Sequence, residues 1–139
     1  MDNQELKSRI LKVLGESKVG SLATVKENKP HSRYMTFFNE DLTLYTPTSK
    51  ETYKADEIEK NPYVHILLGY EGDGTGDAYI EVQGKAVIKE EQHLKDKYWS
   101  VKMKKWIESP NDPNFIILEV KPETIRLMND NGEPEILQL

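Results

Sequence analysis

An arginine lies inside a short extended run of the sequence, where a charge needs a partner. The run covers residues 31 to 38, and alternation of side chains along a strand places Arg33 on the same face as Met35 and Phe37. Burial of an unpaired charge is unfavourable, so an anion must lie against the guanidinium. Two partners are open: a phosphate, which a guanidinium binds through two parallel hydrogen bonds, and one of the 24 carboxylates of the chain. Spacing alone favours the ion pair.

A second polar segment joins the end of a predicted strand to the start of a predicted helix. Residues 45 to 54 read Tyr-Thr-Pro-Thr-Ser-Lys-Glu-Thr-Tyr-Lys, so hydroxyls, two lysines and the amides of a helix start converge there. Unpaired amides and the helix dipole both favour an anion at such a position. The alternative is ordinary capping by Thr48 or Ser49, with solvated lysines. An intervening hairpin could bring this segment to the same end of the sheet as Arg33, which favours a joint anion site.

Other kinds of chemistry receive no support from the sequence. The chain has no Cys and three widely spaced histidines, so no metal site is expected. The glycine-rich signatures of dinucleotide- and triphosphate-binding loops are lacking, as is the nucleophile elbow of hydrolases. No residue demands a particular general acid or base, so no catalytic residue is assigned.

Charge and composition argue against a nucleic-acid or membrane partner. The chain has 139 residues, of which 24 are acidic and 19 basic, and its net charge is -5. Five lysines and three aromatic residues are interleaved between residues 95 and 106, but nearby acids dilute the positive field, which favours an exposed helix. No apolar run approaches membrane-spanning length, and residues 1 to 15 mix acids with bases. We therefore expect a cytoplasmic protein.

Hydrophobic periodicity predicts three helices around a sheet of short strands. Asp2 and Glu5 are spaced as in a capping box, at the start of an amphipathic helix that ends at Gly15. Further helices are expected at residues 49 to 60 and 90 to 107. Strands are expected at residues 19 to 25, 31 to 38, 42 to 46, 63 to 70, 78 to 88, 115 to 120 and 124 to 128.

These elements predict one domain over residues 1 to 139, because no composition shift or repeat marks a second one. Pro47 is expected to end the third strand, and Gly84 to mark a bulge or bend. Residues 129 to 139 are expected to form a loose C-terminal tail. The predicted fold is mainly β (α+β), a six- or seven-stranded antiparallel split β-barrel with flanking helices.

Several short motifs, in the same order along the chain, resemble one family. They are Lys-Pro-His-Ser-Arg-Tyr-Met at residues 29 to 35, Leu-Tyr-Thr followed by Ser-Lys within residues 44 to 50, Ile-Glu-Lys-Asn-Pro-Tyr-Val at residues 58 to 64, and residues 106 to 113 with Asn-Asp-Pro. The chain resembles the pyridoxamine 5'-phosphate oxidase-like flavin-binding split barrels, and most closely their general stress protein 26 branch. The resemblance covers about residues 4 to 128.

The resemblance implies a homodimer that holds a flavin at the subunit interface. The flavin would be FMN, with FAD and a deazaflavin as alternatives. Arg33 matches the first phosphate-binding arginine of the family, and the strand that follows it would run beside the flavin ring through its backbone. Ser49 and Lys54 match positions on the phosphate side. The implied cofactor-binding residues are Arg33, Tyr34, Met35, Thr36, Tyr45, Thr46, Ser49, Lys50, Lys54 and Trp106.

The chain also departs from the pattern of the family. Tyr53 stands where oxidases of this fold have an arginine, Tyr79 where they often have a glutamine, and Leu127-Met128 where this branch tends to have Tyr-Trp. The C-terminus lacks the Arg and His that bind the substrate phosphate in oxidases of pyridoxamine phosphate.

The resemblance therefore implies a stress-related flavin-dependent oxidoreductase of unknown substrate, with NAD(P)H as an electron donor, that is not a true pyridoxamine phosphate oxidase. A non-catalytic protein that holds flavin for storage or sensing is the alternative, and an interaction module without a cofactor is a third reading.

Overall fold

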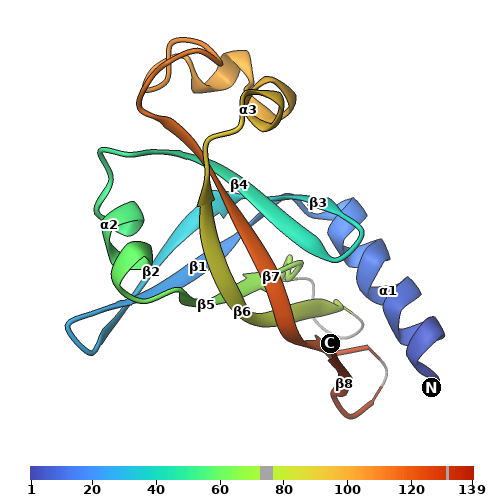
Figure 1. Ribbon diagram of the computed structural model, residues 1–139. Helices are drawn as coiled ribbons and strands as arrows, with labels where there is room; N and C mark the ends of the chain where they lie inside the picture. The colour runs from blue at the N-terminus through green and yellow to red at the C-terminus, as the bar shows by residue number, and fades with distance from the viewer. Residues whose placement is uncertain (73–76, 131) are drawn as a thin grey trace.

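The computed structural model describes residues 1–72, 77–130 and 132–139 (Figure 1). The helices are α1 (Asn3–Glu16), α2 (Tyr53–Lys60), α3 (Gln92–Tyr98) and the short 3-10 helix η1 (Val101–Met103). The strands are β1 (Val19–Lys26), β2 (Lys29–Thr36), β3 (Phe38–Glu40), β4 (Thr43–Ser49), β5 (Tyr63–Leu68), β6 (Tyr79–Lys89), β7 (Phe115–Met128) and β8 (Glu135–Gln138).

The strands form one antiparallel sheet that curls into a half-barrel (Figure 1). The strand order is β2-β1-β5-β6-β7-β4-β3, and β8 pairs with β7 beside this path. Strands β2 and β3 lie at opposite ends of the order, yet only Phe37 separates them in the sequence. The sheet must therefore curl until its two ends meet, and Phe37 is buried at that junction, with 1% of its surface exposed. The predicted antiparallel split barrel with flanking helices is confirmed.

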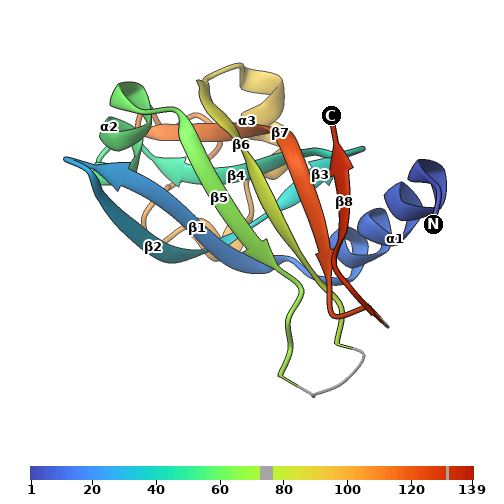
Figure 2. The ribbon, with the colours of Figure 1, turned by 90° about the horizontal axis from the view of Figure 1, so that it is seen from below.

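Two helices cover opposite sides of the barrel. Figures 1 and 2 place α1 and α2 far apart, with the strands between them. Leu6 and Ile10 of α1, together with Ala55 and Ile58 of α2, belong to the same buried cluster as the inward side chains of the strands. The predicted cap of α1 is present, since the Glu5 amide donates to the Asp2 carboxylate over 2.8 Å. One continuous core thus joins both helices to the sheet.

A second apolar cluster lies on the outer face of β4 and β7, under α3. Neighbouring residues along these strands alternate between the two clusters: Leu44 and Leu118 belong to the first, whereas Tyr45 and Ile117 belong to the second. The helix α3 contacts both strands. The expected helix at residues 90 to 107 is wrong in extent, because α3 ends at Tyr98 and η1 follows. The indole of Trp99 donates to the Ile107 carbonyl over 3.2 Å, which folds this segment back on itself.

Three further expectations are corrected by the sheet. Pro47 does not end its strand, because β3 pairs only with residues 43 to 45 and the missing N–H at Pro47 faces an unpaired edge. Residues 115 to 128 form one long strand instead of two. The C-terminal segment is not a loose tail, since β8 pairs with β7 and buries Leu137.

The predicted bulge at Gly84 is present and has a steric cause. The register between β6 and β7 shifts between Gln83 and Gly84. A Cβ atom on Gly84 would lie 2.4 Å from the Lys121 carbonyl oxygen and 3.1 Å from the Pro122 Cα atom. Only glycine allows the two backbones to approach this closely.

Replacement of Gly84 by alanine is expected to lower the free energy of unfolding by about 1–3 kcal/mol, because the two central strands must separate locally. Urea denaturation followed by circular dichroism measures this change. Gly15, whose added Cβ would meet nothing within 4 Å, provides the matched control. Equal stability of the two alanine variants would contradict the steric explanation.

Candidate functional site

The two polar segments identified in the sequence come together where β2 ends. The hydroxyl of Thr46 in β4 donates to the carbonyl of Thr36, the last residue of β2, over 2.7 Å. Thr46 is fully buried. The contact arises because Phe37 turns the chain from one edge of the sheet to the other. Strand β2 is a terminal strand that pairs with β1, so its other edge has no strand partner among the described residues.

The guanidinium of Arg33 points inward, toward α2. Its Nη2 atom donates to Glu57 Oε2 over 3.1 Å, and its Nη1 atom donates to Thr24 Oγ1 over 2.7 Å and to the Leu22 carbonyl over 3.2 Å. Of the two partners that the sequence left open, the carboxylate is the one present here. Phosphate binding by Arg33 stays a prediction.

Glu57 is a buried acid that the sequence analysis missed. It lies in α2 with 2% of its surface exposed, and Oε2 also accepts a hydrogen bond from the Thr24 hydroxyl. Burial raises the pKa of this carboxyl, but the hydrogen bonds from Thr24 and Arg33 outweigh burial, so the pKa lies below its ordinary value. Thr24 is the one indication of this buried polar contact in the sequence. Strand alternation places it, a polar residue, on the same inward face as Leu22.

The start of α2 carries hydroxyls and cations. The helix begins one residue after Thr52, so Ser49 is not its N-cap. Ser49 Oγ accepts from the Glu51 amide over 3.2 Å, and the Thr52 hydroxyl donates to the Ser49 carbonyl instead of capping the helix. Lys50 is exposed and forms an ion pair with Glu90 at 2.6 Å. The side chains of Tyr53 and Lys54 lie outside the described part of the structure.

Tyr45 is buried beneath α3. Its ring lies 5.2 Å from that of Tyr98, which in turn lies 5.1 Å from the ring of Phe38. Burial, followed by the negative charge of Glu119, raises the pKa of Tyr45 to about 12. The phenol therefore stays protonated at neutral pH, and its contact with a flavin stays a prediction.

The other predicted residues occupy three different environments. Met35 is half-buried and packs against the main core. Tyr34 points away from the barrel with 84% of its surface exposed. Trp106 is also exposed and follows η1, at some remove in the sequence from the β2–β4 contact. The structure thus joins Thr36 to Thr46, and Arg33 to Glu57 in α2.

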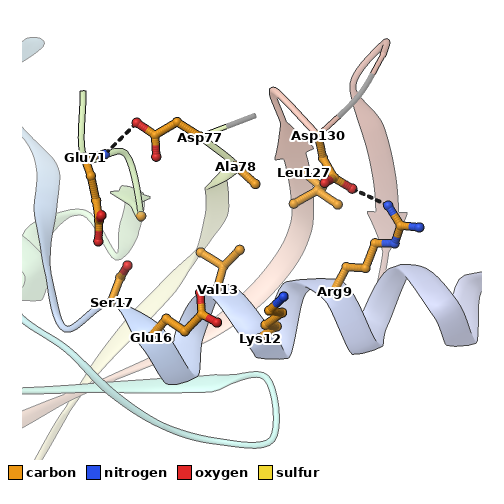
Figure 3. A pocket seen from close by; sticks show the side chains of 11 residues that line it. Arg9, Lys12, Val13, Glu16, Ser17, Glu71, Asp77, Ala78, Leu127 and Asp130 are labelled. Atoms are coloured by element: carbon orange, nitrogen blue, oxygen red, sulfur yellow. Dashed lines mark hydrogen bonds and ion pairs between the residues drawn. The ribbon is translucent and has the colours of Figure 1, made fainter. Parts of the chain in front are cut away.

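A pocket of about 330 Å³ lies elsewhere, between α1 and the turns at the far end of the sheet (Figure 3). Arg9 donates to Asp130 over 2.6 Å across it. Asp77 accepts from the amides of Glu71 and Gly72 over 2.9 and 2.7 Å. None of the predicted cofactor-binding residues lines this pocket.

The described residues offer neither a metal site nor a membrane-spanning helix. No group of three His, Cys, Asp or Glu side chains is placed to hold a metal ion within residues 1–72, 77–130 and 132–139. No helix among those residues is both long and apolar enough to cross a membrane.

The family model described as pyridoxamine 5'-phosphate oxidase matches residues 6–129. The chain belongs to this pyridoxamine 5'-phosphate oxidase family. General stress protein 26 of Bacillus subtilis (strain 168) is 62% identical over 129 residues, which are 93% of this chain and 92% of the relative. The crystal structure of general stress protein 26 from Bacillus anthracis str. Sterne has a TM-score of 0.88 and 41% identity, covering 97% of this chain and 99% of that chain. The predicted general stress protein 26 branch is confirmed.

A solved structure with much lower sequence identity has the same fold. It is that of a Clostridium acetobutylicum protein described as related to general stress protein 26, with 15% identity and a TM-score of 0.82 over 99% of this chain and 97% of that chain. The split barrel therefore persists where most of the sequence has changed.

A flavin with a phosphate fits the donor chemistry of this region. Lys50 and the hydroxyl-bearing segment before α2 offer a cation and hydrogen-bond donors to a phosphate. The open edge of β2 offers backbone N–H and C=O groups to the polar edge of a ring. Arg33 can reach a phosphate only by sharing its guanidinium with Glu57 or by leaving it.

Proposed function

We propose that this member of the pyridoxamine 5'-phosphate oxidase family is a homodimeric FMN-binding protein that acts as a flavin-dependent oxidoreductase. The observation that carries the proposal is the contact between Thr36 and Thr46. It sets the open backbone edge of β2 beside a segment that carries hydroxyls and lysines. FAD has the same phosphate next to its isoalloxazine-bearing chain, so the same contacts accommodate it.

The residues of the chain would bind and orient the cofactor. Lys50, Ser49 and Lys54 would hold the phosphate, and the backbone from Arg33 to Thr36 would align the ring. When bound, the flavin supplies the capacity to accept and donate electrons, with NAD(P)H as the donor. The aromatic packing of Tyr45 against Tyr98 keeps water away from the outer face of β4.

The outer face of β1, β2 and β5 supports a dimer. Ser21 is the register partner of both Tyr34 and Leu67, so these two exposed side chains flank it on one face. Val19 and Val87 are exposed on the same sheet. Exposed apolar side chains clustered on a strand face mark a contact surface, and we propose a second copy of the chain as the partner.

Replacement of Tyr34 by glutamate is expected to weaken the dimer at least tenfold, because a charge would be buried at an apolar contact. Sedimentation equilibrium of the purified chain measures the dissociation constant. Tyr70→Glu, at another exposed tyrosine, is the control. A wild-type chain that is monomeric at micromolar concentration would contradict the dimer.

A non-catalytic flavin carrier is the second candidate. Within the described part of the site, Arg33 forms an ion pair with Glu57 and Lys50 forms one with Glu90. The Tyr45 phenol stays protonated because its pKa is raised to about 12. This arrangement favours holding a ligand over proton transfer.

The visible absorption spectrum of the purified chain, with and without added FMN, tests flavin binding. A flavin spectrum together with oxidation of NAD(P)H would support the oxidoreductase. Bound flavin that NAD(P)H and other donors reduce without turnover would favour the carrier. A colourless chain that binds neither FMN nor FAD would overturn both.

A further inference from the structure

Glu57 holds the guanidinium that the flavin phosphate would need. Arg33 donates to Glu57 Oε2 over 3.1 Å, and the two side chains are 15% and 1% exposed. A carboxylate in such a place is stabilised by its cation and by hydrogen bonds, not by water. The ionised form of Glu57 therefore depends on Arg33.

The two carboxylate oxygens of Glu57 differ in their hydrogen bonds. Oε2 accepts from both Thr24 and Arg33, whereas Oε1 is buried and has no hydrogen-bond partner among the described residues. Loss of the Arg33 contact would leave a buried carboxylate that keeps the hydrogen bond from the Thr24 hydroxyl but has lost its cation. An anion that draws Arg33 away is thus opposed by the desolvation of Glu57.

The position of Glu57 brings it close to the segment that would hold a phosphate. Glu57 is four residues after Tyr53, where α2 begins, which is about one helical turn or roughly 6 Å along the axis. A phosphate at the start of α2 and the carboxylate of Glu57 are both negatively charged, so both would be attracted to the guanidinium of Arg33. Like charges at this separation repel each other strongly in a partly buried site.

We propose that Glu57 competes with the phosphate of the cofactor for Arg33 and so sets how strongly the site prefers FMN to riboflavin; this inference rests on the proposed flavin binding. FMN and riboflavin share the ring and the ribityl chain and differ in the phosphate. The ratio of their dissociation constants therefore isolates the phosphate contribution from the ring contribution.

The test is fluorescence titration of the full-length apoprotein with FMN and with riboflavin at neutral pH. Glu57→Gln keeps the size of the side chain and removes its charge. We expect this variant to raise the preference for FMN over riboflavin about tenfold, the order of effect of one charge-assisted hydrogen bond. Glu59→Gln removes an exposed charge from the same helix and is expected to leave the preference within twofold of wild type. In an Arg33→Met background, Glu57→Gln is expected to raise the preference clearly less than in wild type, because only the direct repulsion between the carboxylate and the phosphate is then removed.

The outcomes separate this inference from the proposed function. An unchanged or reduced preference for FMN in Glu57→Gln, with both flavins still bound, would overturn the competition and leave flavin binding intact. Failure of wild type and of every variant to bind either flavin would overturn the proposed function and this inference with it. If Glu57→Gln does not fold by circular dichroism, Glu57→Asp tests the same point, because it withdraws the carboxylate from Arg33 while keeping the charge. A smaller gain in FMN preference is then expected, and no gain would overturn the competition.

Discussion

Replacement of Arg33 by alanine is expected to lower the free energy of unfolding by about 3–5 kcal/mol at neutral pH. The loss comes less from the missing hydrogen bonds than from Glu57, which is left as a buried carboxylate without its cation. Urea denaturation followed by circular dichroism measures the change. The double variant Arg33→Ala with Glu57→Gln is expected to recover part of the loss, since it removes the uncompensated charge. A loss below about 1 kcal/mol in the single variant would contradict the buried ion pair.

The same ion pair predicts how stability depends on pH. The pKa of Glu57 is lowered in the folded protein, so its contribution to stability is fully present above the unfolded pKa of 4.5 and is lost as the pH falls through the folded value. In Arg33→Ala, burial without a cation favours the protonated carboxyl, which relieves the destabilisation at acid pH. The stability difference between wild type and Arg33→Ala should therefore narrow as the pH falls from the raised pKa of Glu57 in the variant, above 4.5, to its lowered pKa in wild type. Denaturation curves between pH 7 and pH 3 test this, and a difference that is constant across the range would count against it.

Replacement of Phe37 by alanine is expected to lower the free energy of unfolding by about 3–5 kcal/mol. Phe37 is buried at the junction of β2 and β3, and its amide donates to the Lys18 carbonyl over 2.6 Å. Truncation leaves a cavity where the two ends of the sheet meet, so FMN binding should weaken as well. Thermal and urea denaturation measure the stability.

Phe38, the next residue, supplies the matched control. It is half-buried on the outer face and stacks against Tyr98, so Phe38→Ala should cost clearly less than Phe37→Ala. Equal losses in the two variants would show that the junction has no special role in closing the barrel.

Much of the fold could be predicted because local signals agree with it. The periodicity of α1 and its Asp2 cap, the bulge at Gly84 and the antiparallel strands all depend on neighbouring residues. The errors arose where tertiary context decides. Pro47 is tolerated within β4 because β3 is too short to pair at that position, and the length of β3 is not visible in the alternation pattern. The short strand β8 exists because β7 offers it an edge.

The candidate site was predictable in its residues and less so in its contacts. The residue types at Arg33 and in residues 45 to 54 indicate anion chemistry, and the family is visible in the motifs. The choice between a phosphate and a carboxylate as the partner of Arg33 could not be made, because it depends on how α2 packs on β1 and β6 and so brings Glu57 to Arg33. Glu57 is one of 24 carboxylates in the chain, and nothing local distinguishes it until the helix is in place.

The central place of β7 in the strand order has a consequence for biosynthesis. Strand β4 joins the rest of the sheet through β7, which also pairs with β6, and β7 is made after both of these strands. While the chain emerges from the ribosome, one edge of β6 and one edge of β4 have no partner, and such open edges invite association with other chains. The nascent protein thus passes through an aggregation-prone stage that ends only when residues 115 to 128 have left the exit tunnel.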